Sequence, residues 1–146
     1  MRSRTRSVLC VAALVTTSAC FVEVLEGSGE AATEQRDLES FSTLHNTTFL
    51  DVSLSLATEQ LVEVTCDDNR LEYLETVVSE AGELLLRQRI TGDEPNTYVS
   101  LKPSVACGVT IAATELRRAV NAGSGELQGV GAFVDLTRIE SAGSGA

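Results

Sequence analysis

Few side chains in this chain of 146 residues have the types and spacings that do chemistry. Its one histidine, His45 in "TLHNTTF", has no serine or cysteine motif that would make it a general base, so a polar residue before a turn is the simpler interpretation. Asp93 and Glu94 lie in a turn, and adjacent residues on a strand point to opposite faces, which does not suit the paired carboxylates of a glycoside hydrolase. We expect no enzyme activity and no catalytic residues.

Metal and phosphate sites have little support as well. Cys66 and Cys107 lack the CxxC spacing or histidine partners of a zinc site. The Asp-Asp-Asn run at 67–69 offers oxygen atoms to a hard cation such as Ca²⁺, but a calcium loop needs several more ligands at fixed offsets, and a solvated turn is the alternative. The Gly-Ser-Gly run at 123–125 lacks the lysine of a phosphate-binding loop. The sequence predicts no metal and no cofactor.

Cys66 and Cys107 have two interpretations. In an oxidising compartment an isolated pair of cysteines is a disulfide candidate. Both residues could instead be small buried apolar side chains. We favour the disulfide, which by a loop-entropy estimate would stabilise the fold by about 4 kcal/mol less any strain.

The N-terminus predicts an export signal over residues 1–19. Three arginines within the first six residues precede an apolar run from Val8 to Val15, and small residues then lead to Cys20. The apolar run is too short to cross a bilayer, which takes roughly 20 residues.

Cys20 itself could carry a lipid. The run "TSAC" has the small residues of a bacterial lipoprotein signal, but Thr17 stands where a leucine-like residue is expected. The alternative is ordinary cleavage after Ala19, which would leave Cys20 free. We favour lipidation of Cys20 and therefore a membrane anchor.

The charge of the processed chain limits its partners. Removing residues 1–19 takes away three of the 11 basic residues and none of the 21 acidic ones, which leaves a formal charge of −13. Such a surface repels nucleic acid and anionic lipid headgroups. It would tolerate cationic partners, although acidity that simply keeps an exported protein soluble explains the same composition.

The remaining chain divides into two parts. Residues 20–36 hold a Gly-Ser-Gly run and scattered acids, and are interpreted as a flexible tether. From residue 37 to 146 the apolar pattern alternates, as in half-buried strands. Strands are expected at "DVSLSLA", "LVEVTC" and 97–101, a hairpin in "TVVSEAGELLLRQR" with Gly82 in its turn, and at most one helical turn in "DDNRLEYLETV".

A repeat closes the chain. Ala-Gly-Ser-Gly at 122–125 returns at 142–145, and Leu116 and Ala119 match Leu136 and Ile139 at the same period of twenty. Short strands with glycine corners at this period predict one coil of a β-solenoid. The expected corner residues are Gly123, Gly125, Gly143 and Gly145. A pair of flexible Gly/Ser linkers is the alternative.

Four segments together carry a family resemblance: "GSGEAATEQRDLESF", "LVEVTCDDNRLEYLETVVSEAGELLL", "NAGSGELQGV" and "ESAGSGA". They cover roughly residues 27–146, and they resemble the head GIN domain family, whose members are described as candidate auto-transporter adhesins. The resemblance implies an all-β, right-handed, single-stranded β-helix with exposed strands and no established catalytic residues. The sequence departs from the family pattern at "HNTTFLDV", which lacks the expected glycines, and at "LATEQ". The domain over 37–146 also stops where relatives run through further corners, so we expect it to be incomplete at its C-terminus.

These observations predict a non-catalytic exported envelope lipoprotein. We expect it in the outer membrane, on either the periplasmic or the surface face. Its β-solenoid surface would serve adhesion by binding an unidentified protein or glycan. The alternative is a structural or stress-related envelope component that pairs, or self-associates, through a strand edge. A polysaccharide-active β-helix enzyme is a weaker alternative, because a lyase for acidic sugars wants a basic cleft and the processed chain has one lysine, Lys102.

Overall fold

The computed structural model of the chain describes residues 21–91, 97–131 and 136–145. Cys20 and the predicted signal, together with Asp93 and Glu94, lie outside the described residues. The described elements are β1 (Phe21–Glu26), β2 (Ala31–Gln35), β3 (Thr43–Asn46), β4 (Asp51–Leu56), β5 (Leu61–Asp67), the 3₁₀ helix η1 (Asp68–Tyr73), β6 (Leu74–Val78), β7 (Glu83–Gln88), β8 (Thr97–Lys102), β9 (Gly108–Ala113), β10 (Arg118–Asn121), β11 (Leu127–Val130) and β12 (Arg138–Ser141). No helix among these residues is long and apolar enough to span a bilayer.

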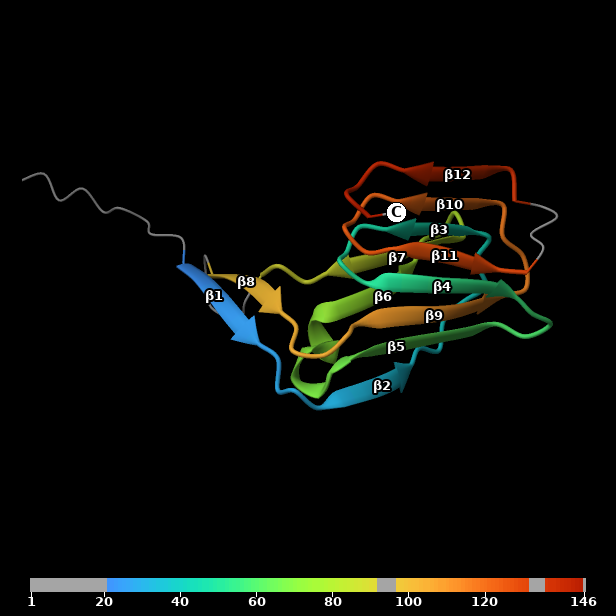
Figure 1. Cartoon of the computed structure of the whole chain (residues 1–146). Helices are drawn as coiled ribbons and strands as arrows, with labels where there is room; N and C mark the ends of the chain where they lie inside the picture. Colours follow the sequence, from blue (N-terminus) through green and yellow to red (C-terminus); the bar gives the residue numbers. More distant parts are fainter. Residues whose placement is uncertain (1–20, 92–96, 132–135, 146) are drawn as a thin grey trace, which may run out of the picture.

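The strands form two five-stranded sheets and one two-stranded sheet. The first sheet has the order β12-β10-β3-β7-β6, and the second has the order β11-β4-β9-β5-β2. These two sheets lie face to face, while β1 and β8 form the small sheet at one end of the molecule (Figure 1). The fold is therefore all-β, as expected.

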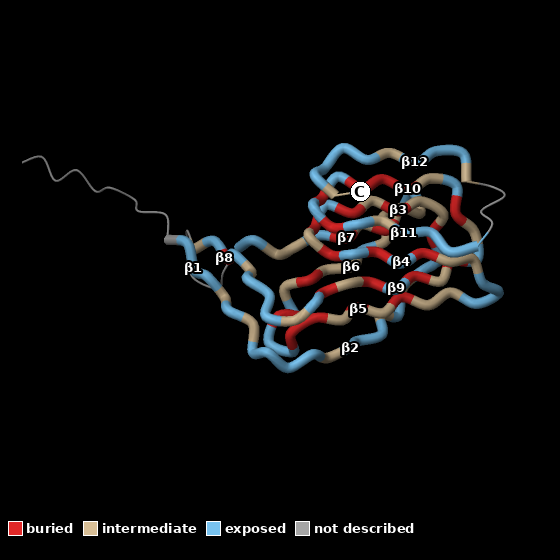
Figure 2. Tube along the Cα trace, viewed as in Figure 1, coloured by how far each residue is buried: buried red, intermediate tan, exposed pale blue. Residues whose placement is uncertain are grey.

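The hydrophobic core lies between the two larger sheets, where Figure 2 shows the buried stretches of their strands. Buried residues alternate with partly buried or exposed ones along β3, β4, β5 and β9, which places every second side chain in the core. The fully buried apolar side chains include Leu44, Leu84 and Leu86 of the first sheet and Val64, Ile111 and Ala113 of the second. Burying each leucine, valine or isoleucine stabilises the fold by about 1.5–3 kcal/mol.

The expected right-handed single-stranded β-helix is wrong. The sheets are separate and mix directions, because β5 runs antiparallel to both β2 and β9, and β6 runs antiparallel to β7. These reversals interrupt any continuous coil. The period of twenty produces parallel stacking only locally, where β10 pairs with β12 and Ala119 lies opposite Ile139.

The segment interpreted as a flexible tether contains two paired strands. β1 pairs in parallel with β8, and β2 pairs antiparallel with β5, where the hydroxyls of Thr33 and Thr65 are 2.7 Å apart. The alternation in "FVEVLE" carries this signal, but the strand forms only against a partner far along the chain. The strands of residues 21–35 therefore belong to the folded domain.

Other local expectations are confirmed. "DVSLSLA" and "LVEVTC" form β4 and β5, and residues 97–101 lie in β8. β6 and β7 make the predicted hairpin, whose turn places Gly82 at φ 73°, a conformation that side chains disfavour. Helical structure occurs in the expected window, but the six residues of η1 make about two 3₁₀ turns where at most one turn was expected.

Candidate functional site

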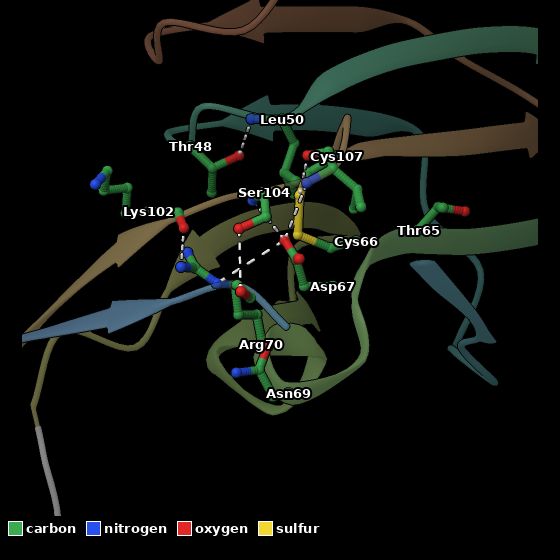
Figure 3. Close-up of a disulfide and its surroundings, with 12 residues drawn as sticks. Thr48, Leu50, Thr65, Cys66, Asp67, Asn69, Arg70, Lys102, Ser104 and Cys107 are labelled. Carbon is green, nitrogen blue, oxygen red and sulfur yellow. Dashed lines mark hydrogen bonds and ion pairs between the residues drawn. A yellow bond between two sulfur atoms is a disulfide. The ribbon is translucent and has the colours of Figure 1, made fainter. Parts of the chain in front are cut away.

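Cys66 and Cys107 are joined by a disulfide in the structure, with their Cα atoms 4.3 Å apart (Figure 3). Cys66 lies near the end of β5, and Cys107 immediately precedes β9, so the bond fastens the two strands together where they begin to pair. The two sulfur atoms and an Asp67 oxygen lie within 4.8 Å of one another. Because the sulfurs are bonded to each other, they offer no thiolate to a metal ion. The cluster therefore has no zinc chemistry.

Asp67, the last residue of β5, is a fully buried carboxylate. It accepts hydrogen bonds from the backbone N–H groups of Gly29 at 2.9 Å, Ser104 at 3.0 Å and Val105 at 3.4 Å. Burial raises the pKa of Asp67, but these backbone donors and the positive charge of Arg70 outweigh it and leave the pKa below its ordinary value. Asp67 is thus held as an ionised structural group.

The rest of the Asp-Asp-Asn run also organises the chain. The Ser28 hydroxyl donates to Asp68 Oδ1 at 2.5 Å, and the Ser28 N–H donates to Asn69 Oδ1 at 3.1 Å. Asn69 Nδ2 in turn donates to the carbonyl of Glu26 at 3.0 Å. Asp68 and Asn69 therefore bind the turn that follows β1, about 40 positions earlier in the chain, an arrangement that neither the solvated turn nor the cation site anticipated.

Arg70 is the largest fully buried side chain in the described part of the chain. Its Nη2 donates to the carbonyls of Leu25 and Lys102, near the ends of β1 and β8, and its Nε lies 3.9 Å from Asp67 Oδ2 (Figure 3). Burial lowers the pKa of Arg70, while Asp67 and Glu26 raise it in part. Arg70 therefore works as a clamp that fixes the β1–β8 sheet to the larger body.

A column of polar residues crosses the first sheet. Asn46 lies opposite Asn121, which lies opposite Ser141, on three successive parallel strands. Asn46 Nδ2 donates to Asn121 Oδ1 at 3.1 Å and to the carbonyl of Leu50 at 3.2 Å. In the same way, each of the other two residues donates to the carbonyl four residues ahead: Asn121 Nδ2 to Gly125 at 2.7 Å, and Ser141 Oγ to Gly145 at 3.1 Å. We call these three residues the polar column.

The predicted glycine corners lie beside this column and are stacked on one another. A Cβ on Gly143 would overlap the carbonyl oxygen of Gly123, and a Cβ on Gly145 would overlap that of Gly125. Gly123 in turn lies against the carbonyl of Thr48. The corners are glycines because the backbones of successive turns approach too closely for side chains.

His45 lies on the outer face of the first sheet and is half-buried. Its Nδ1 is 3.5 Å from Glu83 Oε1 on the neighbouring strand β7. A histidine facing a carboxylate across a sheet is an ordinary cross-strand pair. The geometry gives His45 no reacting partner.

A surface hollow of about 460 Å³ lies beside β6. Arg36 is prominent in its lining: it donates to the carbonyl of Leu71 at 3.0 Å and pairs with Glu34 at 2.8 Å. Glu72, Glu75 and Arg87 contribute further charges. The hollow is open and polar, unlike the mostly apolar concave pockets that hold small molecules.

Sequence reasoning missed Arg70 and the pair Asn46–Asn121. An arginine in an acidic run is normally solvated, so nothing in the sequence indicated that Arg70 is buried. The asparagines left a weak signal, since each ends a strand and precedes a corner, in "HNTTFLDV" and "VNAGSGELQ". Their register, 75 positions apart, becomes apparent only in the fold.

No family model and no curated protein matches the chain. Among solved structures, a candidate lipid-binding protein from Parabacteroides distasonis is 20% identical, with a TM-score of 0.58 over 73% of this chain and 44% of that one. A candidate adhesin from the same organism is 16% identical, with a TM-score of 0.59 over 73% of this chain and 42% of that one. A candidate adhesin from Bacteroides fragilis is 12% identical, with a TM-score of 0.60 over 83% of this chain and 62% of that one.

At these identities the comparisons show a shared all-β fold and nothing finer. The chain spans less than two thirds of the length of each of these structures. Similarity to candidate adhesins agrees with the broader part of the resemblance found in the sequence. Membership of the head GIN domain family stays a prediction.

Proposed function

We propose that the chain is a non-catalytic, exported binding module, held at the bacterial envelope by a lipid on Cys20. The proposal that the chain is non-catalytic rests on one observation: its buried ionised and sulfur-containing side chains are engaged in structural contacts. Asp67 and Arg70 hold the β1–β8 sheet, and Cys66 and Cys107 are bonded to each other. Groups committed in this way are not free to act on a substrate.

The comparisons support a binding role by analogy of fold alone. The neighbours are named candidate adhesins in two of the cases above, and a candidate lipid-binding protein in the third. The proposed ligand is a protein or glycan outside the cell membrane. The acidic surface argues against nucleic acid, because a net charge of −13 after processing repels phosphates.

The first experiment is the intact mass of the protein from the membrane fraction, with and without reductant. We expect a mass that begins at Cys20 and includes a lipid, and that gains two hydrogen atoms when the reductant reduces Cys66–Cys107. A mass without lipid contradicts the anchor. Cys20→Ser is the matched control and is expected to move the protein out of the membrane fraction.

The binding role is tested separately, with the Cys20→Ser protein on panels of glycans and extracellular proteins. We expect the protein to retain a ligand. The Asp67→Asn variant should bind the same ligand as long as it folds, because Asp67 has a structural role. Depolymerisation of any polysaccharide on the panel would overturn the non-catalytic proposal.

A second candidate function is pairing through a strand edge. Ile139 continues the inward-facing row of Leu44 and Ala119, yet it is 66% exposed because β12 is the edge strand of its sheet among the described residues. An unpaired apolar edge is a template for another strand. Sedimentation of the Cys20→Ser protein should show oligomers that Ile139→Lys abolishes and Thr58→Lys, in the β4–β5 loop, does not. A monomer at all concentrations excludes this function.

A further inference from the structure

The outer face of the β1–β8 sheet carries an exposed apolar surface. Val22, Val24 and Tyr98 are 66%, 53% and 45% exposed. Val22 lies opposite Tyr98 in the parallel register, and Val24 lies two positions further along the same strand, so the three side chains point to one side. We call these three residues the outer face.

On the opposite face of the same sheet, the side chains of β8 are covered. Val99 is 6% exposed, and Leu101 packs against the hydrophobic core. Parallel sheets are normally buried on both faces, and a two-stranded sheet is marginal by itself. Both faces of a parallel sheet are normally covered, but the described residues leave the outer face of the β1–β8 sheet uncovered.

The outer face is fixed rigidly to the domain. Arg70 binds the carbonyls of Leu25 and Lys102, and the N–H of Gly27 donates to that of Lys102 at 3.0 Å. Lys102 Nζ also pairs with Glu26 Oε1 at 3.0 Å across the two strands. Because these bonds fix β1 to the domain, a contact made by β1 sets the orientation of the whole domain.

The distance to Cys20 limits what can cover the outer face. Val22 is two residues from Cys20, and two extended residues span at most about 7 Å. The polar headgroup layer of a bilayer is itself about 5–8 Å thick on each side. A lipid on Cys20 therefore brings Val22 to the membrane interface, and β1 carries Tyr98 and Val24 with it.

The chemistry of the outer face fits that interface. Tyrosine concentrates at headgroup depth because it has an apolar body and a polar tip. The nearby charges of Glu26 and Lys102 neutralise each other, whereas the acidic domain as a whole would be repelled by anionic lipids. A zwitterionic lipid surface is thus the better occupant.

We propose that the outer face of the β1–β8 sheet rests on a zwitterionic membrane surface and sets the orientation of the domain. This inference rests on the proposed lipid anchor at Cys20. The lipid on Cys20 provides the affinity for the membrane, and the contact of the outer face fixes the angle between the domain and the membrane. Figure 1 shows the β4–β5 loop at the far end of the sandwich from β1 and β8, so this end would point away from the membrane.

The test uses the lipidated full-length protein in phosphatidylcholine vesicles that contain a shallow spin-labelled quencher. The sequence has no tryptophan, so Tyr98→Trp gives a single reporter on the outer face. Thr58→Trp, in the β4–β5 loop, is the matched control. We expect loss of most of the emission for Tyr98→Trp and no loss for Thr58→Trp. Adding Val24→Asp should restore the Tyr98→Trp emission.

The outcomes separate the two proposals. Intact mass is measured first on each variant, and absence of the lipid overturns the anchor and the orientation together. If the lipid is present and Tyr98→Trp is not quenched, the orientation is overturned and the anchor stands. Emission that shifts with protein concentration but not with quencher would identify a second copy on the outer face, which also overturns the membrane contact.

Discussion

Asn46 and Asn121 occupy matching positions on β3 and β10, and the amide of Asn46 donates to the side-chain oxygen of Asn121 at 3.1 Å. Each asparagine also binds the carbonyl four residues ahead, at Leu50 and Gly125. The two corners therefore have one internal support, repeated on successive strands. The polar column therefore explains how the turn at 122–125, which contains glycines, stacks on the turn at 47–50, which contains none.

Removing Asn121 should destabilise the fold. In Asn121→Ala the buried carbonyl of Gly125 and the amide of Asn46 lose their partner, which costs about 2–3 kcal/mol. Ser141→Ala is the matched control at the exposed end of the column, with a cost of about 0.5 kcal/mol or less. Urea unfolding of both variants checks this, and equal costs would contradict the buried role of Asn121.

Extending the polar column should stabilise the fold. In Ser141→Asn the new side chain can accept from Asn121 and still donate to the carbonyl of Gly145, as Asn121 does to Gly125. One additional hydrogen bond contributes about 0.5–1.5 kcal/mol, less where water competes. Thermal unfolding measures the gain, for which Ser141→Thr is the control. A loss of stability would show that the register at β12 is not maintained.

Substitution at a stacked corner should be far more costly than at its neighbour. A Cβ at Gly123 would overlap the carbonyl of Thr48, which is backbone and cannot turn aside. Gly123→Ala is therefore expected to cost at least about 2 kcal/mol. Ala122→Ser, at an exposed position one residue earlier, should leave stability nearly unchanged. Chemical denaturation compares the two, and a tolerated Gly123→Ala would rule out the close stacking.

The disulfide should stabilise the fold mainly by lowering the conformational entropy of the denatured chain. The bond closes a loop of 41 positions, and the double variant Cys66→Ala/Cys107→Ala is expected to lose about 4 kcal/mol. The matched measurement is unfolding of the unaltered protein with and without reductant. Reduction should have no effect on the double variant, and any effect there would point to another disulfide.

Asp67 should give the fold an acid-sensitive component. Its pKa in the fold lies below the ordinary 3.8, so its contribution is fully present above that value and is lost as the pH falls through the folded pKa. Asp67→Asn should remove this pH dependence and lower stability near neutrality. Glu140, whose pKa is lowered by its hydrogen bond to Arg118, makes Glu140→Gln the comparison. Stability that is unchanged between pH 6 and 2 in the unaltered protein, about four units, would be inconsistent with both shifts.

Local pattern predicted the strands that alternate clearly and have close neighbours. β4, β5 and the β6–β7 hairpin followed from period two and from a glycine at the turn. β1 and β2 were missed because their partners, β8 and β5, are distant in sequence and their composition resembles a linker. The short polar β2 has no signature until its partner is known, whereas β1 does alternate and was still interpreted as part of a tether.

The β-helix prediction failed for a related reason. The period of twenty correctly aligns Ala119 with Ile139, but the same alignment could not reveal that β9 pairs antiparallel with β5. One local repeat was extended to the whole domain. Likewise, the sequence pointed to Cys66 and Cys107 as a pair, while the burial of Arg70 depends on carbonyls from two strands that meet only in the folded chain.

The long reach of the strand pairs has a consequence for the timing of folding. Glu26 and Lys102 are 76 positions apart, and Asn46 and Asn121 are 75 apart, yet each pair joins adjacent strands. Neither the small sheet nor the first large sheet can be completed until the last third of the chain is available. Such distant contacts slow folding, because the loop must close before the strands stabilise each other. The pairs β2–β5, β3–β7 and β6–β7 need only residues up to 88 and can form earlier, whereas all three sheets close only once strands from β8 onward are available.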